Sequence, residues 1–393
     1  MSGKTMTMRS APRCAAALLL LAAGPAGREA RAVGRRQPVP ETVRILLRSG
    51  TTGFELDAPG DFNVVDTASR RVLMGVRPGK VRVEARAGQF WFGRYPLPWR
   101  ELRIVPSPGS QWLGADGTRY RGTLRVIPDP AGNDRLSLVN DIEMEEYLVG
   151  VIGREMPAGW PMAALAAQAI AARSHALHAV RTQREQPYDL VANRSQAYGG
   201  FDAESPAARE AVQQTAGLIL YHRGKPLPAY FSATCGGHTE NGHEVFPGDG
   251  PMPPAVRCDW CRQGSHYQWA LERSADEVTR QLQAAGLVRG AVRDIQVAAL
   301  TATGRVRTVT IETSAGAESV SGTQLRRALG PDALRSLWFQ VGRTGSGFRF
   351  AGRGWGHGVG LCQNGAGAMA KAGAGAGYIL RHYYPGTEVK AAQ

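Results

Sequence analysis

Two closely spaced pairs of possible metal ligands lie near one another in the chain. Cys235 and His238 occur in the sequence CGGH, and Cys258 and Cys261 occur in CDWC. Three thiolates and one imidazole suit tetrahedral zinc, and such short spacings are typical of structural zinc sites. A site that kept one position for water would instead be catalytic. Two disulfides are the alternative, which an oxidising compartment would favour. The spare histidine candidates are His243 and His266.

One carboxyl is surrounded by apolar residues in a way that suits acid catalysis. Glu155 follows the apolar run 148–152 and precedes Met156 and Pro157. Burial disfavours the ionised carboxylate, so we expect a raised pKa and a general acid at neutral pH. A capping or ion-paired glutamate beside a helix is the alternative, and from residue type alone it is the commoner one.

A glycine-rich segment, residues 352–370 with the sequence GRGWGHGVGLCQNGAGAMA, surrounds a histidine, a cysteine and a glutamine. It has neither the dinucleotide spacing nor the P-loop spacing, so a phosphate cradle is weakly supported. His357 and Cys362 are a possible base and nucleophile, but no neighbouring residue supplies the third, orienting group. A small buried thiol is the simpler interpretation of Cys362. His357 is either buried and hydrogen-bonded or faces a ligand.

The elements that must position these residues are mixed. Short β-branched runs separated by turn residues predict strands from residue 43 to about 127. Residues 161–182 predict an Ala-rich helix that begins at Pro161, with Arg173 inside its apolar stripe. An arginine there either pairs with a carboxylate or faces a cleft. Further helices are expected at 206–216, from Ser274 and at 323–330, so we predict an α+β fold with mostly antiparallel strands and a central Ala-rich helix.

The N-terminus indicates export. Basic residues, a short apolar run and an ARA sequence predict a signal peptide over residues 1–32, followed by a linker over 33–40. The apolar run is too short to span a bilayer, so the mature chain is expected to have no transmembrane span and a periplasmic or cell-envelope location. We expect a β-rich part, 41–130, continuous with a catalytic part, 131–390. The net charge of +14 favours an anionic partner, but dispersed basic residues argue against nucleic acid.

Four ordered segments resemble the SpoIID/LytB family of bacterial envelope proteins, over about residues 41–390. They are EEYLVGVIGREMPAGWPMAALAAQAIAARSHAL, SQAYGG, AYFSATCGGHTENGHEVF and GWGHGVGLCQNGAGAMAKAGAGAGYILRHYYPGTEV. The resemblance implies a SpoIID-like fold and a peptidoglycan substrate. Members related to SpoIID are lytic transglycosylases of glycan strands, preferably denuded ones, and members related to LytB are amidase enhancers.

The resemblance also implies roles for individual residues. It makes Glu155 the catalytic acid. It places five residues around the substrate: Arg173, Gln196, Tyr198, His357 and Gln363. Trp355 is a further candidate, as a stacking face for a sugar.

The chain departs from the family pattern at two places. Cys362 stands where serine is usual, which argues against thiol catalysis. Arg194 and Ser195 stand where some members carry zinc-binding His-Cys, so any zinc must lie elsewhere. The set Cys235, His238, Cys258 and Cys261 is then the natural replacement for a structural zinc.

The first hypothesis for function is a lytic transglycosylase in which Glu155 acts as acid and then as base. A 1,6-anhydromuramoyl product would form, and no organic cofactor would be needed. The second hypothesis is a non-catalytic peptidoglycan-binding protein that assists an amidase. The third is a zinc-dependent hydrolase that uses the cysteine cluster.

Overall fold

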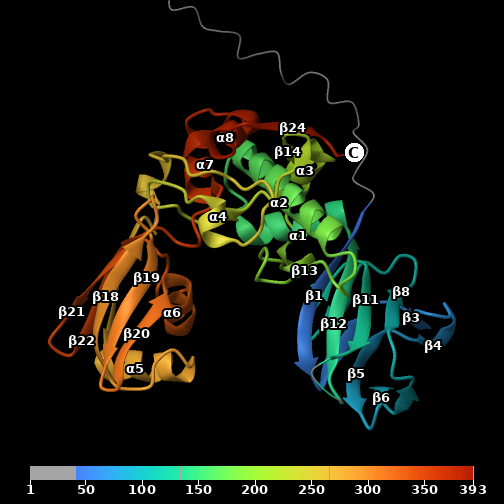
Figure 1. The fold of residues 1–393 in the computed structure, drawn as a ribbon. Coiled ribbons are helices and arrows are strands. Elements are labelled where there is room, and N and C mark those ends of the chain that lie inside the picture. Colours follow the sequence, from blue (N-terminus) through green and yellow to red (C-terminus); the bar gives the residue numbers. More distant parts are fainter. Residues whose placement is uncertain (1–40, 131, 133, 265, 393) are drawn as a thin grey trace, which may run out of the picture. The chain divides into compact units, whose positions relative to one another are not determined.

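The computed structural model describes residues 41–392 except 131, 133 and 265 (Figure 1). The predicted signal peptide and linker, residues 1–40, lie outside the described residues. The fold is α+β, as predicted, and most strand pairs are antiparallel. Two described pairs of strands, β1 with β13 and β16 with β23, are parallel.

The N-terminal part is built from two antiparallel-rich sheets. Seven strands pair in the order β13-β1-β12-β11-β8-β3-β4, and six pair in the order β10-β9-β2-β5-β6-β7. Alternate side chains such as Phe54, Phe62 and Phe90 are fully buried in a shared core, as expected for sheets with one buried face. The strands are β1 (Thr42–Thr51), β2 (Gly53–Ala58), β3 (Phe62–Asp66), β4 (Val72–Val76), β5 (Gly79–Arg86), β6 (Gln89–Phe92), β7 (Tyr95–Leu97), β8 (Leu102–Pro106), β9 (Leu113–Ala115), β10 (Thr118–Tyr120), β11 (Thr123–Pro128), β12 (Leu136–Glu143) and β13 (Leu190–Val191).

A helical core follows, with the Ala-rich helix α2 at its centre. From Ala164 to Leu177 nearly every residue of α2 is buried, and α2 contacts α1, α3, α7, α8 and β14. Alanine side chains allow these neighbours to approach closely on several sides. The predicted helix over 161–182 is confirmed, with Pro161 as the N-cap residue.

This core is formed by elements from both halves of the chain, and several of them are short. They are α1 (Met144–Glu155), α2 (Met162–Thr182), η1 (Gly200–Ala203), α3 (Pro206–Gln214), β14 (Leu218–His222), β15 (Lys225–Pro226), β16 (Phe231–Ser232), α4 (Gly242–Val245), η2 (Trp260–Gln263), β23 (Leu361–Cys362), α7 (Gln363–Lys371), α8 (Ala376–Tyr383) and β24 (Thr387–Ala391). Among the described helices, none combines the length and the apolar character needed to cross a bilayer.

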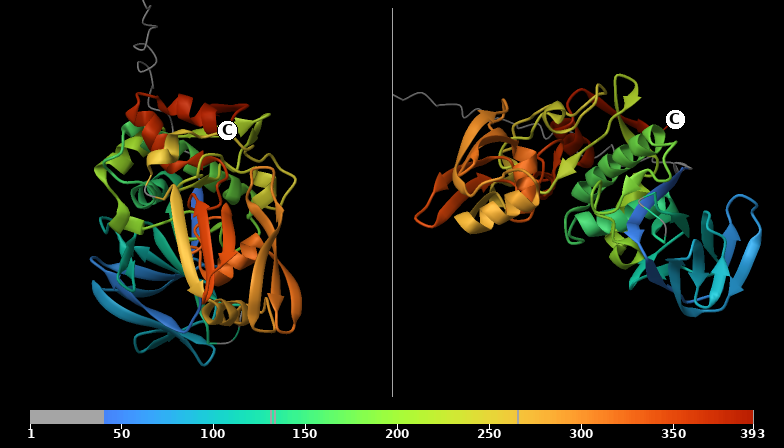
Figure 2. Two further views of the ribbon diagram at one scale, coloured as in Figure 1. Left: turned by 90° about the vertical axis from the view of Figure 1, so that its left-hand side faces the viewer. Right: turned by 60° about the horizontal axis from the view of Figure 1, so that its bottom comes forward.

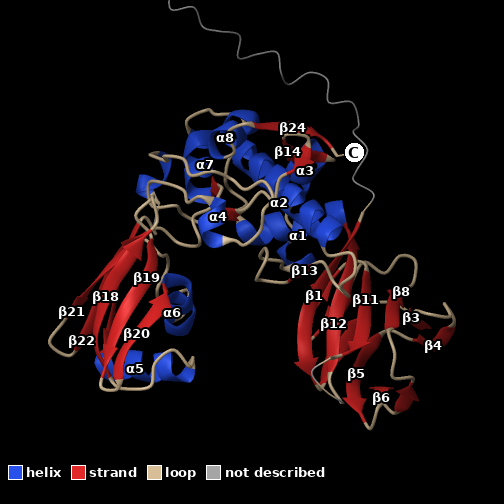
Figure 3. Ribbon diagram, in the orientation of Figure 1, coloured by secondary structure: helices blue, strands red, loops and turns tan. Residues whose placement is uncertain are grey.

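Residues 268–353 have a hydrophobic cluster of their own, which was not separated at the sequence level. Two three-stranded sheets, β17-β22-β21 and β18-β19-β20, pack with α5 and α6 (Figures 2 and 3). The expected helix after Ser274 is present as α5. The hydroxyl of Ser274 caps it by accepting from Glu277 N. The elements are β17 (Gln268–Ser274), α5 (Ala275–Ala284), β18 (Val292–Leu300), β19 (Val306–Thr313), β20 (Gly316–Ser321), α6 (Gly322–Leu329), β21 (Phe339–Arg343) and β22 (Gly347–Arg353).

Candidate active site

Glu155 is the last residue of α1, and both of its carboxylate oxygens are held by donors from distant segments. The backbone N–H of Ala197 donates to Oε1 at 2.6 Å, and the side-chain amide of Gln363 donates to Oε2 at 2.9 Å. The Glu155 side chain is half-buried. Segments that are 42 and 208 residues away in sequence therefore converge on one carboxyl group.

Two glycines of α1 allow the Ala197 segment to come this close. A Cβ at Gly153 would clash with the carbonyl oxygen of Ala203, and one at Gly150 would lie 2.9 Å from the ring of Tyr198. The backbone at 197–203 thus runs against α1 at distances that a side chain would prevent. The Ala197 N–H then reaches the end of the helix, where Glu155 lies.

Gln196 and Tyr198, predicted to contact substrate, are instead buried on either side of Ala197. The amide of Gln196 donates to the carbonyl of Ala172 at 3.1 Å, and the hydroxyl of Tyr198 donates to Asn140 Oδ1 at 2.9 Å. Both side chains are engaged by the protein itself. The structure therefore corrects their placement: they fix the peptide that binds Glu155.

Burial raises the pKa of Glu155 above its ordinary value of 4.5. The hydrogen bonds from Ala197 and Gln363 and the charge of Arg154 act in the opposite direction but do not cancel the effect of burial. The C-terminal end of a helix also disfavours a negative charge. A carboxyl in this setting keeps its proton to higher pH than an exposed glutamate does, and two neutral donors are in place to bind its oxygens once it is ionised.

Gln363 is the first residue of α7, and the sulfur of Cys362 caps that helix by accepting from Gly365 N at 3.4 Å. Trp160 packs on the same face of α7, because a Cβ at Gly367 would lie 2.9 Å from its ring. Gly367 is four residues after Gln363, so the half-buried Trp160 lies one helical turn from the Glu155 amide partner. Sequence reasoning missed Trp160, although it lies five residues after Glu155 in the same motif.

The structure also corrects the predicted role of Arg173. Its side chain is fully buried, and it forms a bidentate ion pair with Glu145 at 2.9 and 2.7 Å. It donates further to the carbonyl oxygens of Val212 and Leu218. Its donors are engaged in the core, and none of the hydrogen bonds described for Arg173 goes to Glu155.

His357 and Trp355 are engaged by other parts of the protein. The Nδ1 of His357 accepts from Val359 N at 3.0 Å, and the ring also bonds to the backbone of Phe231. Burial lowers the pKa of His357 to about 3, so the ring is neutral. Trp355 contacts the His266 ring edge-on, and the guanidinium of Arg335 lies over it at 5.5 Å. Among the described residues, Gln363 is the one predicted partner whose side chain hydrogen-bonds to Glu155.

A second constellation lies beside Gln363, and here the predicted set changes by one member. The sulfurs of Cys235, Cys258, Cys261 and Cys362 all lie within 4.8 Å of one another. His238 is not among the residues whose ligand atoms gather there, and its Nδ1 lies 2.7 Å from the carbonyl oxygen of Thr239. Cys362 takes the fourth position.

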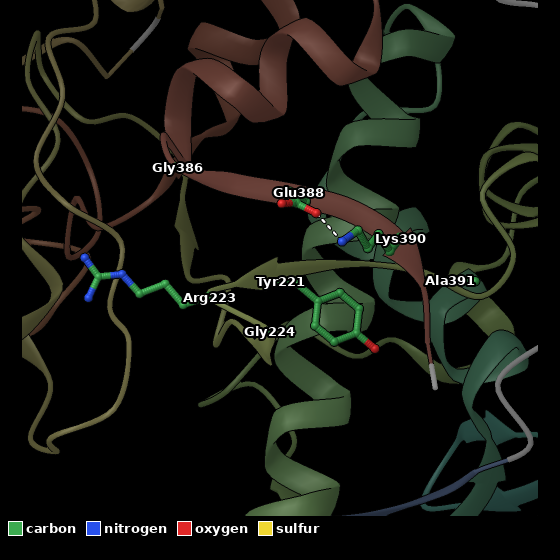
Figure 4. Close-up of a pocket in the computed structure, with 7 residues that line it drawn as sticks. All are labelled: Tyr221, Arg223, Gly224, Gly386, Glu388, Lys390 and Ala391. Atoms are coloured by element: carbon green, nitrogen blue, oxygen red, sulfur yellow. Dashed lines mark ion pairs between the residues drawn. The ribbon is translucent and has the colours of Figure 1, made fainter.

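Two hollows in the described surface lie at other elements. One of about 150 Å³ lies over β14 and β24, where Glu388 and Lys390 form an ion pair beside Tyr221 (Figure 4). A larger groove of about 890 Å³ lies on the 268–353 region and includes Trp338. Neither is lined by Glu155 or Gln363.

The chain is similar to known proteins over most of its length. Residues 132–222 match the family model described as Stage II sporulation protein, and residues 260–360 match one described as Domain of unknown function (DUF8618). An uncharacterized protein of Brachyspira hyodysenteriae is 32% identical over 70% of this chain and 73% of its own length.

Two Bacillus subtilis proteins are also similar. The Amidase enhancer is 28% identical over 73% of this chain and 46% of its own length. Stage II sporulation protein D is 30% identical over 74% of this chain and 91% of its own length. The chain therefore belongs to the SpoIID/LytB family.

Proposed function

We propose that this protein is a lytic transglycosylase that cleaves peptidoglycan glycan strands outside the cytoplasm, with Glu155 as its acid and base. The observation that carries the proposal is the Glu155 carboxyl itself. Burial raises its pKa, and two neutral donors hold its oxygens. The kinship with a sporulation protein and an amidase enhancer supports a role at the cell wall.

One carboxyl is enough for this reaction because the substrate supplies the nucleophile. Protonated Glu155 donates its proton to the glycosidic oxygen, and the leaving sugar departs with that oxygen as a hydroxyl. The C6 hydroxyl of the muramic sugar attacks its own C1, and ionised Glu155 takes the hydroxyl proton. Hydrolysis by glycosidases, in contrast, typically needs a second carboxyl to serve water or a covalent intermediate. The 1,6-anhydro product forms without consuming water, and Glu155 ends protonated.

The donors to Glu155 have distinct tasks in this scheme. Ala197 N–H, fixed between two anchored side chains, holds Oε1 and leaves the other oxygen to Gln363. The Gln363 amide stabilises the carboxylate that exists between the two proton transfers. Trp160 packs on α7 at Gly367, one helical turn after Gln363. There it offers an aromatic face for a sugar ring.

A second candidate function is favoured by the relative named as an amidase enhancer. In that case the protein would bind glycan without cleaving it and would stimulate an amidase. Mass spectrometry of products from denuded glycan strands separates the two. Anhydro ends, lighter by one water than hydrolysed ends, support the transglycosylase.

The matched variants are Glu155→Gln and Glu143→Gln. Glu143 is an exposed residue just before α1, and its substitution is expected to leave cleavage unchanged. Glu155→Gln is expected to abolish anhydro products. Binding without cleavage by the unaltered protein, together with stimulation of an amidase, would establish the second function instead.

A further inference from the structure

We propose that Cys235, Cys258, Cys261 and Cys362 bind one structural Zn²⁺, and that this ion fixes Gln363 in position against Glu155. The four sulfurs lie within 4.8 Å of one another, and Cys235 and Cys261 are 3.6 Å apart. Tetrahedral zinc with bonds of about 2.3 Å requires sulfurs about 3.8 Å apart. The cluster therefore needs only a small contraction to enclose one ion.

The surroundings of the sulfurs suit thiolates. Cys235 N lies 3.3 Å and Gly365 N 3.4 Å from the Cys362 sulfur, and both backbone groups donate to it. The hydroxyl of Tyr383 lies 3.2 Å from the Cys258 sulfur. Donors of this kind are the outer contacts that orient metal-bound ligands.

A buried cation lies beside the cluster. Four thiolates and one Zn²⁺ carry a net charge of −2, which is costly in a protein interior unless it is compensated. Arg305 is 2% exposed, and its guanidinium donates to the carbonyl oxygens of Cys235 and His238, at 2.9 and 2.7 Å. The guanidinium of Arg305 also lies 3.9 Å from the carboxylate of Glu240. Its positive charge would therefore partly balance both Glu240 and the thiolate cluster.

The geometry favours a closed structural ion over two disulfides and over a catalytic zinc. Each disulfide would bring only its own two sulfurs to about 2 Å. Here all four sulfurs gather around one centre. All four cysteines are at most 1% exposed. Four protein ligands in a closed shell leave no position for water, which distinguishes a structural site from a catalytic one.

The ion would join three segments at the edge of the active site. Cys235 follows β16, Cys258 and Cys261 flank the start of η2, and Cys362 ends β23, which pairs with β16. Gln363 is the residue directly after Cys362, and the amide of Asn364 donates to Ala233 O at 3.0 Å. Zinc would hold the start of α7 against β16, and so hold the Gln363 amide at the Glu155 carboxyl.

The first experiment measures metal in protein purified without added metal. We expect about one zinc per chain by plasma mass spectrometry, with four thiols that react only after denaturation and chelation. Replacement by Co²⁺ should give the visible absorption bands of a tetrahedral tetrathiolate centre. Cys258→Ser should reduce bound zinc at least about tenfold, whereas His238→Ala should leave it unchanged.

Cys362→Ser is the second variant, because serine also caps helices and so preserves the start of α7. It should lose zinc while remaining folded. A metal-free preparation with two intact disulfides, or zinc retained by both cysteine variants and lost by His238→Ala, would overturn the proposal.

The link to Gln363 rests on the proposed function and is tested without relying on activity. Hydrogen exchange of the 361–371 peptide should be slow with zinc and faster after its removal, with peptides of β1 unchanged as the control. Restored zinc should restore protection. Unchanged exchange would remove the link to Gln363. If zinc protects the segment but the protein never cleaves glycan, the positioning stands and the transglycosylase assignment fails.

Discussion

Two of the three glutamates of helix α1, Glu145 and Glu155, lie ten residues apart in surroundings that are opposite in kind. Glu145, in the first turn, receives two hydrogen bonds from the fully buried guanidinium of Arg173. Glu155, at the last residue, is held by a backbone N–H and a neutral amide. The helix dipole favours a negative charge at the first position and disfavours it at the second.

The difference teaches which carboxyl can transfer a proton. The partner of Glu145 is a charged, buried guanidinium, whereas both donors to Glu155 are neutral. A carboxyl that is buried among neutral donors retains its proton to higher pH. The same residue type on one helix is thus structural at one end and suited to chemistry at the other.

The largest expected effect comes from removing the titratable group. Glu155→Gln should lower kcat on denuded glycan by about 10²–10⁴-fold, since a positioned acid and base contributes about that much. Glu145→Gln should leave kcat per folded molecule unchanged. Initial rates normalised to folded protein check both, and a catalytic loss in Glu145→Gln as large as that in Glu155→Gln would break the comparison.

The next effect is on stability. Removing one partner of a buried ion pair leaves the other charge uncompensated, which costs about 3–5 kcal/mol. Arg173→Met should therefore lower the free energy of unfolding by about that amount. The double variant Glu145→Gln with Arg173→Met should recover most of it. Urea denaturation measures both, and a double variant no more stable than Arg173→Met would contradict the pairing.

Loss of the amide donor should affect both the rate and the pH profile. A hydrogen bond to a charged group is worth about 1.5–3 kcal/mol, so Gln363→Ala should lower kcat/KM by about ten- to a hundredfold. The Gln363 bond lowers the pKa of Glu155, so its removal raises that pKa further. Protonated Glu155 then persists to higher pH, and the alkaline limb of kcat/KM should move upward.

Gln213→Ala is the control for this substitution, since Gln213 is exposed on α3. It should change neither the rate nor the alkaline limb. A limb that moves downward in Gln363→Ala would show that the amide does not stabilise the carboxylate.

Sequence patterns predicted what depends on local chemistry. Alanine content and Pro161 predicted helix α2, and apolar flanking residues predicted a raised pKa for Glu155. They did not predict contacts made by chain closure. His238 satisfied a short spacing, but the β16–β23 pair brings Cys362 to the cluster across 127 residues. The position of Arg173 on an apolar stripe was compatible with an ion pair to a carboxylate or with a cleft. Only the fold identifies Glu145 as its ion-pair partner.

The smallest effect sharpens the comparison through pH. Because the pKa of Glu155 is raised above 4.5, the folded state holds this proton more tightly than the unfolded chain. The carboxyl therefore makes stability fall as pH rises from about 4.5 through the folded-state pKa.

A glutamine at position 155 does not titrate, and Gln363 can rotate its amide so that its oxygen accepts from the new side-chain amide. Glu155→Gln should raise the melting temperature at pH 7 and have little effect near pH 4, as measured by thermal scans at both values. If the substitution instead lowers stability at pH 7 more than at pH 4, the fold favours the ionised form of Glu155.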